Sequence, residues 1–348
     1  MGLPGSGLAP ATYAQRRQLA FESGRAVCDL ARRGIRARDI LTPAAIQNAV
    51  RVVSSISGST NAVLHLCALA HEAELDLDVM ECFRSMYFTT PQLARVNPAA
   101  KWDMEDFFQA GGIPRVMDRL GDLIDRSALT CTGKTVGENL AEYAYLYPEN
   151  PEIVRTRQDP FAPVGGIAVL RGNLAPRTGV TKPGAYPETL HHFEGRAKVF
   201  DGEEAADRAI LAGEIQPGDV LVVRYEGPRG GPGMREMYKA MKLLYGMGLG
   251  GCTAVITDGR FSGTNNGCFV GHISPEAAEG GPIALVEDGD RIVVDVPQGR
   301  IDVDLTQEEL SRRRAKWTPP QMPPVPRGYL RRYAKEATSA DRGAILQD

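Results

Sequence analysis

The sequence predicts a mixed α/β protein in which a mainly helical first part precedes a β-rich second part. Residues up to about 150 carry helix-forming side chains and few strand signals. After Pro148, Pro151 and Pro160 the chain changes to short β-branched runs separated by glycine and aspartate. A chain of 348 residues also exceeds the usual size of one compact domain. We therefore expect two domains, residues 1–157 and 158–348, that meet in a proline-rich stretch without periodicity.

Three segments of the first part are predicted to be helices. Residues 16–33 and 79–87 are rich in helix formers. A third helix is expected from Thr60, because apolar residues recur there at i, i+3, i+4 and i+7, namely Val63, Leu66, Cys67 and Ala70.

The second part is predicted to alternate strands with a few helices. The strand candidates are residues 167–170, 220–225, 253–257 and 291–296, and the helix candidates between them are residues 203–212 and 234–245. Thr306 and Glu309 form a capping-box pattern that opens a basic helix ending near Trp317. A proline-rich connector then leads to a last helix over residues 329–337.

The bulk properties exclude several classes of function. The net charge of −3 arises from interspersed acids and bases, so no basic stripe is available for nucleic acid. No apolar run approaches the roughly 20 residues that cross a bilayer, and the start lacks the order of a signal peptide. We expect a cytoplasmic protein with no nucleic-acid or membrane partner.

The cysteines do not suggest a metal site or a disulfide framework. They show no Cys-x-x-Cys pair and no partner histidines at metal-binding spacing. Small buried side chains are the favoured interpretation for Cys67 and Cys252, which lie in apolar runs. The six are Cys28, Cys67, Cys82, Cys131, Cys252 and Cys268.

The densest chemical signal is the glycine- and proline-rich segment Tyr225–Glu236, between a predicted strand and a predicted helix. Such a loop lets backbone N–H groups approach an anion, so it predicts a phosphate or carboxylate site. The spacing fits neither a Walker loop nor the dinucleotide-binding fingerprint. Glu236 would lie in the first helical turn, where it either stabilises the helix start or binds a metal ion. Glu226 faces the same loop, where it either belongs to the ligand site or stabilises the turn.

The second signal is the segment Thr257–Gly267, again at the end of an apolar strand. Ser262 lies in a glycine-rich turn, where a serine is exposed and suited to base or nucleophile chemistry, although the esterase elbow pattern is absent. Arg260 either pairs with Asp258 or holds a substrate carboxylate in a bidentate fork. His272 and His65 are expected to be hydrogen-bonded structural residues, and His191 and His192 to be exposed.

Taken together, these segments resemble the dihydroxy-acid and 6-phosphogluconate dehydratase family over nearly the whole chain. Six motifs follow one another in the family's order, which is far more specific than any one of them. They are residues 58–66 (Gly-Ser-Thr-Asn-Ala-Val-Leu-His-Leu), Ala110-Gly111-Gly112, 165–176, 226–234, 258–263 (Asp-Gly-Arg-Phe-Ser-Gly) and 271–277.

The resemblance implies an activity and roles for matching residues. The family's enzymes are hydro-lyases that convert a 2,3-dihydroxy acid into a 2-keto acid. It implies that Glu236 is a Mg²⁺ ligand, that Ser262 is the base, and that substrate contacts come from Ser59, Thr60, Asn61, Glu226, Arg260 and Gly263. It also implies a helical remainder of an α/β domain followed by a β-barrel-like swivelling β/β/α domain, and a homodimer when complete.

The resemblance further implies an iron–sulphur cluster, but none of the six cysteines stands in a matching motif. We therefore expect no cluster ligand in this chain. The cluster cysteines and the other magnesium ligands are expected upstream of Met1, so that the chain is a truncated product, a mis-started reading frame or one part of a split enzyme. We expect the chain alone to hold only part of the active site, and to be inactive if those ligands are missing.

The favoured function is dihydroxy-acid dehydratase of valine and isoleucine biosynthesis, acting on acids of the 2,3-dihydroxy-3-methylbutanoate type. A sugar-acid dehydratase acting on aldonates or 6-phosphogluconate is the second candidate. Ser57 replaces a usual glycine, and Asn265 and Asn266 lie in a run that departs from the family, so that polar groups are added. The alternative outside enzyme function is a non-catalytic fragment, or a subunit of a split enzyme.

Overall fold

The computed structural model describes residues 2–97, 99–263, 267–320, 325 and 327–347. It divides into two compact units, the first formed by residues 1–58 and 69–166 and the second by residues 59–68 and 167–348. Thr264, Asn265 and Asn266 lie outside the described residues, as does most of the proline-rich connector. No helix among the described residues is both long and apolar enough to cross a membrane.

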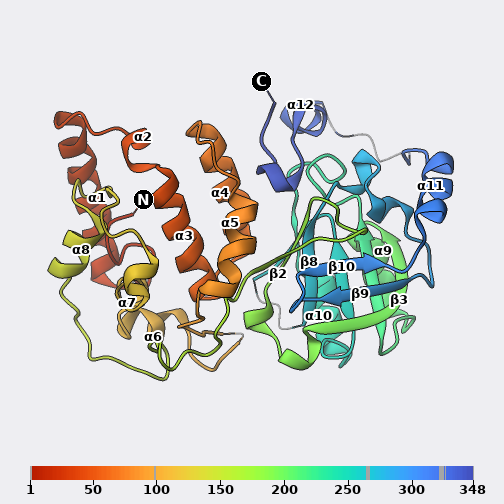
Figure 1. Cartoon of the computed structure of the whole chain (residues 1–348), viewed down its shortest axis with the longest axis horizontal. Coiled ribbons are helices and arrows are strands. Elements are labelled where there is room, and N and C mark those ends of the chain that lie inside the picture. The colour runs from red at the N-terminus through yellow and green to blue at the C-terminus, as the bar shows by residue number, and fades with distance from the viewer. Residues whose placement is uncertain (1, 98, 264–266, 321–324, 326, 348) are drawn as a thin grey trace. The chain divides into compact units, whose positions relative to one another are not determined.

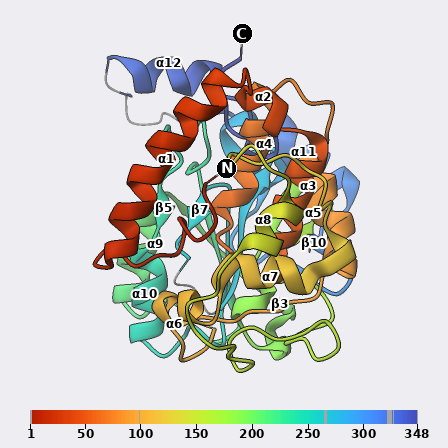
Figure 2. The ribbon, with the colours of Figure 1, turned by 90° about the vertical axis from the view of Figure 1, so that its left-hand side faces the viewer.

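The first unit is helical, as the sequence predicts. Helices α1 and α5 confirm two of the expected segments, and α1 is the long red helix in Figure 2. The core of this first unit contains Phe107, Val116 and Leu120 from the helices, together with Leu93 and Ile153 from the segments that connect them. The helices are α1 (Ala14–Arg32), α2 (Ala37–Ile40), α3 (Pro43–Ser55), α5 (Val79–Met86), α6 (Met104–Gln109), α7 (Gly112–Leu120) and α8 (Val136–Glu142).

One helix contributes to both units. The expected helix from Thr60 is confirmed as α4 (Asn61–Glu72), and its first two turns, up to Ala68, belong to the second unit. Its start is therefore described below together with the sheet.

The second unit is built on one eight-stranded mixed sheet in the order β1-β2-β8-β6-β4-β3-β9-β10. The central strands β3, β4, β6 and β8 are parallel, and the outer pairs are antiparallel. Figure 1 shows β3, β9 and β10 running across one side of this unit. The strands are β1 (Ala168–Leu170), β2 (Thr178–Thr181), β3 (His192–Asp201), β4 (Asp219–Arg224), β6 (Ala254–Thr257), β8 (Cys268–Ser274), β9 (Arg291–Asp295) and β10 (Arg300–Val303).

The two edges of this sheet meet, so that the strands nearly form a closed barrel. Arg171, directly after β1, makes a parallel bridge to Arg300 at the start of β10. The Arg171 N–H donates to the Gly299 carbonyl (2.9 Å), and the Ile301 N–H donates to the Arg171 carbonyl (3.2 Å). Closure removes the exposed sheet edges that would otherwise be free to pair with another chain.

Helices α9 (Glu203–Leu211) and α10 (Lys239–Gly246) pack on one face of this sheet. Ile210, Met241 and Leu244 contribute fully buried side chains that meet Leu221 and Val255 of the strands. The four strands expected in this part are confirmed, whereas β2, β3, β8 and β10 were not anticipated. The two C-terminal helices are also confirmed, as α11 (Gln307–Lys316) and α12 (Tyr329–Glu336).

The predicted helix over residues 234–245 is wrong at its start. Glu236 and Met237 form a short strand, β5, and the helix begins only at Lys239. Met234 adopts a left-handed conformation with φ 48°, which a helix cannot accommodate. Glu236 is therefore a strand residue, so its carboxylate does not stabilise a helix N-terminus.

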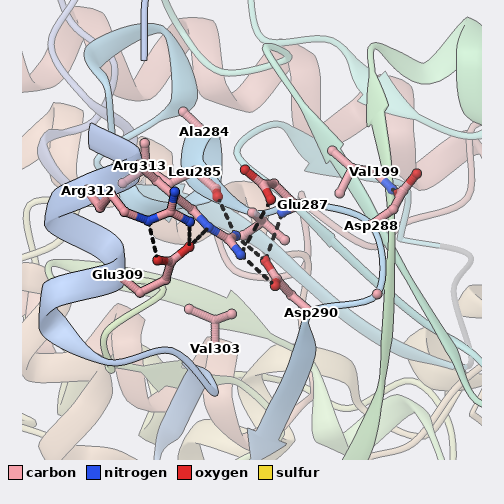
Figure 3. A network of polar contacts seen from close by, with 12 residues as sticks. Val199, Ala284, Leu285, Glu287, Asp288, Asp290, Val303, Glu309, Arg312 and Arg313 are labelled. Carbon is pink, nitrogen blue, oxygen red and sulfur yellow. Dashed lines mark hydrogen bonds and ion pairs between the residues drawn. The ribbon is translucent and has the colours of Figure 1, made fainter. Parts of the chain in front are cut away.

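Helix α11 is fixed to the sheet by a buried ion pair (Figure 3). The Arg313 guanidinium donates from Nη2 to Asp290 Oδ1 (3.0 Å) and from Nη1 to Oδ2, and also to the Leu285 carbonyl (2.9 Å). Both side chains are about one-tenth exposed, and Glu309 adds a third partner on the helix. These partners raise the pKa of Arg313 further above its usual value.

Arg313→Met is expected to destabilise the protein by about 3 kcal/mol, because it leaves the Asp290 carboxylate buried without its cation. The measurement is urea unfolding followed by circular dichroism. The exposed neighbour Arg312, changed to Met, serves as the matched control and should cost less than about 0.5 kcal/mol. Equal losses for both variants would contradict a dominant role for the buried pair.

Candidate functional site

The candidate site is built on a two-stranded ribbon that is separate from the eight-stranded sheet and is labelled β5 and β7 in Figure 2. Strand β5 (Glu236–Met237) runs parallel to β7 (Arg260–Phe261), and Glu236 pairs with Arg260 in register. Because side chains alternate along a strand, the buried Met237 and Phe261 face the core, while Glu236 and Arg260 point the other way.

Ser262 continues this polar face. Its backbone N–H donates to the Met237 carbonyl (3.1 Å), which extends the ladder by one step beyond Phe261. Ser262 lies two residues after Arg260 and directly follows β7, so continued strand alternation predicts that both side chains share one side of the ribbon. It is half-buried, and Gly263 beside it is exposed.

Asn61, in the first turn of α4, contacts two residues of this face. Its side-chain amide donates from Nδ2 to Glu236 Oε1, and Arg260 Nη1 donates to its Oδ1 (3.2 Å). Arg260 is also bound to the loop ahead of β5, because Nε donates to the Met234 carbonyl. The structure thus joins Asn61, Glu236 and Arg260 into one hydrogen-bonded chain.

The residues before Asn61 shape the helix start. The Ser59 hydroxyl accepts from the Asn61 N–H (3.2 Å), and Thr60 is buried. Ser57 belongs to the first unit, where its hydroxyl accepts from Gln92 Nε2 (2.8 Å). The polar group of Ser57 is therefore already bound by the protein.

Two buried carboxylates, Asp258 and Glu226, lie just after the central strands β6 and β4. Asp258 is fully buried and accepts backbone N–H groups from Tyr225 (3.1 Å), Glu226 (3.0 Å) and Ala277 (2.9 Å). Burial raises its pKa to about 6, and the three N–H donors oppose that rise. The expected pairing of Asp258 with Arg260 is wrong, because backbone amides hold Asp258 in the interior.

Glu226 is likewise held by protein groups. Its carboxylate accepts from the Glu203 N–H (2.8 Å) and pairs with Arg235 (3.2 Å). Burial leaves it 5% exposed, so the groups it touches are other parts of this unit. It lies in the loop after β4, ten residues before β5.

Asp258→Asn is expected to destabilise the protein by about 3 kcal/mol at pH 7.5, because an amide NH₂ would replace one acceptor of buried N–H groups. Burial raises the pKa of Asp258 from 3.8 to about 6, so below pH 6 the folded wild type binds a proton that the unfolded chain does not. Wild-type stability, and with it the difference from the Asn variant, should therefore grow as the pH falls from 7.5 to 5. Thermal unfolding of both proteins between pH 5 and 8 tests this expectation. A difference that does not change with pH would show that the pKa of Asp258 is not raised in the fold.

His272 departs from its expected role as a hydrogen-bonded residue. It lies in strand β8 with φ 54°, is fully buried, and no described residue bonds to either ring nitrogen. Burial, followed by the nearby Arg260 and His65, lowers its pKa to about 3. The imidazole is therefore neutral at physiological pH. No sequence pattern signals this burial, because the bulge that creates it depends on the pairing with β2.

Glu236 fits a single-carboxylate Mg²⁺ site, because magnesium is commonly bound by one or two carboxylates and keeps several waters. Its Oε1 contact with an amide, rather than with a cation, leaves the carboxylate charge available. The described residues contain no group of three His, Cys, Asp or Glu side chains placed to hold a metal ion. Glu236 would therefore supply a single ligand to such a site, and the described cysteines form no group of three.

Comparison with known proteins extends this picture. Residues 152–344 match the dihydroxy-acid/6-phosphogluconate dehydratase C-terminal family, and residues 1–139 match the corresponding N-terminal family. Dihydroxy-acid dehydratase from Agathobacter rectalis is 49% identical over 348 residues, covering 99% of this chain and 61% of the relative.

Two further relatives carry the same name. The protein of Moorella thermoacetica is 49% identical over 350 residues, and that of Ignicoccus hospitalis 47% over 347, with 62% of each relative covered. The chain thus spans about three-fifths of the length of the relatives it matches. The sequence motifs, the barrel-like sheet and these matches agree, and the chain belongs to the dihydroxy-acid/6-phosphogluconate dehydratase family.

Proposed function

We propose that this chain supplies the proton-abstracting half of a dihydroxy-acid dehydratase, which converts a 2,3-dihydroxy acid such as 2,3-dihydroxy-3-methylbutanoate into a 2-keto acid for valine and isoleucine synthesis. The observation that carries the proposal is the shared polar face of the β5/β7 ribbon. Glu236 and Arg260 pair in register on this face, Asn61 is bound to both, and Ser262 follows Arg260 by two residues.

Each residue has a role that follows from its chemistry. The Ser262 alkoxide takes the proton from C2, and the C2–H electron pair forms the C2=C3 double bond of the enol. The C3 hydroxyl leaves with its bonding pair and takes up the proton carried by Ser262 to become water, which regenerates the alkoxide. The enol then tautomerises to the 2-keto acid. Asn61 orients the Glu236 carboxylate and fixes the Arg260 side chain. A magnesium ion bound by Glu236 would supply positive charge that favours the Ser262 alkoxide and the developing enolate.

The proposal includes cofactors and partners that this chain does not hold by itself. An iron–sulphur cluster would need ligands other than the described cysteines, which form no group of three. The remaining ligands and the homodimer partner belong to the whole enzyme. No observation favours the sugar-acid alternative, since the Ser57 hydroxyl is bound to Gln92 and Asn265 and Asn266 lie outside the described residues.

The proposal is tested by reconstitution. The chain is co-expressed, under anaerobic conditions with iron and Mg²⁺, with the part of the Agathobacter rectalis enzyme that its match leaves uncovered. We expect 2-keto acid to form from 2,3-dihydroxy-3-methylbutanoate, detected as its phenylhydrazone, and not from either fragment alone. Turnover of aldonates only would overturn the biosynthetic assignment, and turnover of neither substrate by a folded, metal-loaded complex would overturn the proposed function.

A further inference from the structure

The glycine-rich loop after β4 resembles an anion-binding loop, yet its donors already have an acceptor. The Arg229 N–H lies 2.9 Å from Glu276 Oε1 and 3.2 Å from Oε2, and the Gly230 N–H donates to Oε2 (2.9 Å). Gly231 and Met234 donate to carbonyls within the loop, those of Gly227 (2.8 Å) and Gly231 (2.7 Å). The sequence predicts an external phosphate or carboxylate here, and the structure shows an internal one.

Glycine at position 227 makes this contact possible. A Cβ atom there would stand 2.5 Å from Glu276 Oε2 and 2.9 Å from its Cβ, closer than real atoms approach. The loop therefore needs glycine in order to admit the carboxylate of its own chain. This is the usual reason for glycine where a backbone meets an anion.

Glu276 itself depends on these amides. It is 1% exposed, and the Arg229 side chain points elsewhere, to the Ala337 carbonyl (2.8 Å) and to Glu279 (3.5 Å). Burial and the neighbouring Asp258 raise the pKa of Glu276 to about 8, and the N–H groups of Gly230 and Arg229 oppose that rise. Both oxygens accept from amides, which opposes the effect of burial, and the carboxylate form predominates above about pH 8.

The loop is strained at both ends. Tyr225 and Met234, which bracket it, have φ values of 64° and 48° without being glycine. Such conformations cost energy and persist only where contacts fix them. Met234 also gives its carbonyl to Arg260 and stands two residues before Glu236, so the position of the loop sets the position of the ribbon.

We propose that Glu276 is a positioning residue: its carboxylate occupies the anion-binding loop as a permanent internal ligand and thereby fixes Met234, Arg260 and Glu236. The occupancy of the loop does not depend on any activity. The consequence for catalysis rests on the function proposed above for Glu236.

The test is chemical rescue of Glu276→Ala in the intact chain. The substitution removes a CH₂–COO⁻ unit and leaves the N–H groups of Arg229 and Gly230 facing a space that acetate fits. We expect a fall in Tm of about 8 °C or more, and recovery of at least about half of it at high acetate but not at equal chloride. Glu276→Gln should also be impaired, because its NH₂ group cannot accept from an amide.

Glu279→Ala is the matched control. Glu279 lies in the same turn, but its carboxylate pairs with the side chains of Arg177 and Arg229 rather than with backbone N–H groups of the described loop. Acetate should not change its Tm beyond the effect on wild type. A gain of equal size in both variants would show general salt stabilisation and overturn the proposal.

A second readout reports on positioning. The side-chain amide of Asn61, which donates to Glu236, gives a ¹H–¹⁵N signal pair that should shift in Glu276→Ala, return with acetate, and stay in place in Glu279→Ala. If Glu276→Gln has the Tm of the wild type and acetate does not restore the Tm of Glu276→Ala, Glu276 is only a neutral packing group and the proposal is overturned. Acetate could restore the Tm and the Asn61 signals while the reconstituted enzyme shows no dehydration. That result would support the role of Glu276 in the loop and contradict the function proposed for Glu236.

Discussion

Ser262→Ala and Glu236→Gln are each expected to reduce dehydration by at least about 10³-fold in the reconstituted enzyme while leaving the fold intact. Ser262→Ala removes the proton acceptor, and Glu236→Gln removes the charge that a metal ion needs. Glu236 and Ser262 are both only partly buried, and each substitution changes few atoms, so neither opens a cavity in the core. The measurement is steady-state keto-acid formation, with circular dichroism as the folding control.

The two substitutions should not be additive. A base and its activating ion act as a unit, so the double variant is expected to fall within about tenfold of either single one. Glu188→Gln, at an exposed carboxylate of the same unit, is the control and should retain normal turnover. Near-normal turnover of Ser262→Ala would make Ser262 structural and remove the base from the mechanism.

Lys182→Met is expected to stabilise the protein by about 3 kcal/mol at pH 7, because burial lowers the pKa of Lys182 to about 8. The side chain is 8% exposed, and no described residue pairs with its ammonium group. The unfolded state binds more protons than the folded state between pH 8 and the ordinary lysine pKa of 10.5. Wild-type stability should therefore rise with pH across this range.

The Met variant should lack this rise. Methionine has a similar unbranched shape and carries no charge to bury, so its advantage is largest below pH 8 and disappears above pH 10.5. Urea unfolding at a series of pH values measures it, and the exposed Lys316→Met is the control, with no pH-dependent difference. A loss of stability at pH 7 would mean that Lys182 has an anionic partner in solution.

Much of the secondary structure can be predicted from sequence, because periodicity and capping act locally. The apolar spacing of Val63, Leu66 and Ala70 predicts α4, and Thr306 predicts the start of α11, where its hydroxyl accepts from Glu309 N–H. The ten-residue strand β3 is missed because it is half-exposed and carries charges, so it lacks a continuous apolar run. Only its pairing with β4 and β9 makes it a strand.

The site is predictable in its residues but not in its arrangement. The motifs indicate Asn61, Glu236, Arg260 and Ser262, yet spacing alone cannot show that Glu236 lies in a strand paired with Arg260. That pairing depends on Met234 turning the chain before β5. Glu276 was missed as a functional residue because its partners are backbone amides 46 and 47 positions away, which leave no mark in the sequence.

Hydrogen exchange at C2 of the substrate shows directly whether the ribbon face abstracts the proton. The reconstituted enzyme is incubated in D₂O with 2,3-dihydroxy-3-methylbutanoate, and both remaining substrate and product are examined by NMR and mass spectrometry. We predict a primary isotope effect for the C2-deuterated substrate, and loss of both C2 exchange and product in Ser262→Ala. Cleavage of the C2–H bond at the wild-type rate in Ser262→Ala would show that Ser262 is not the base.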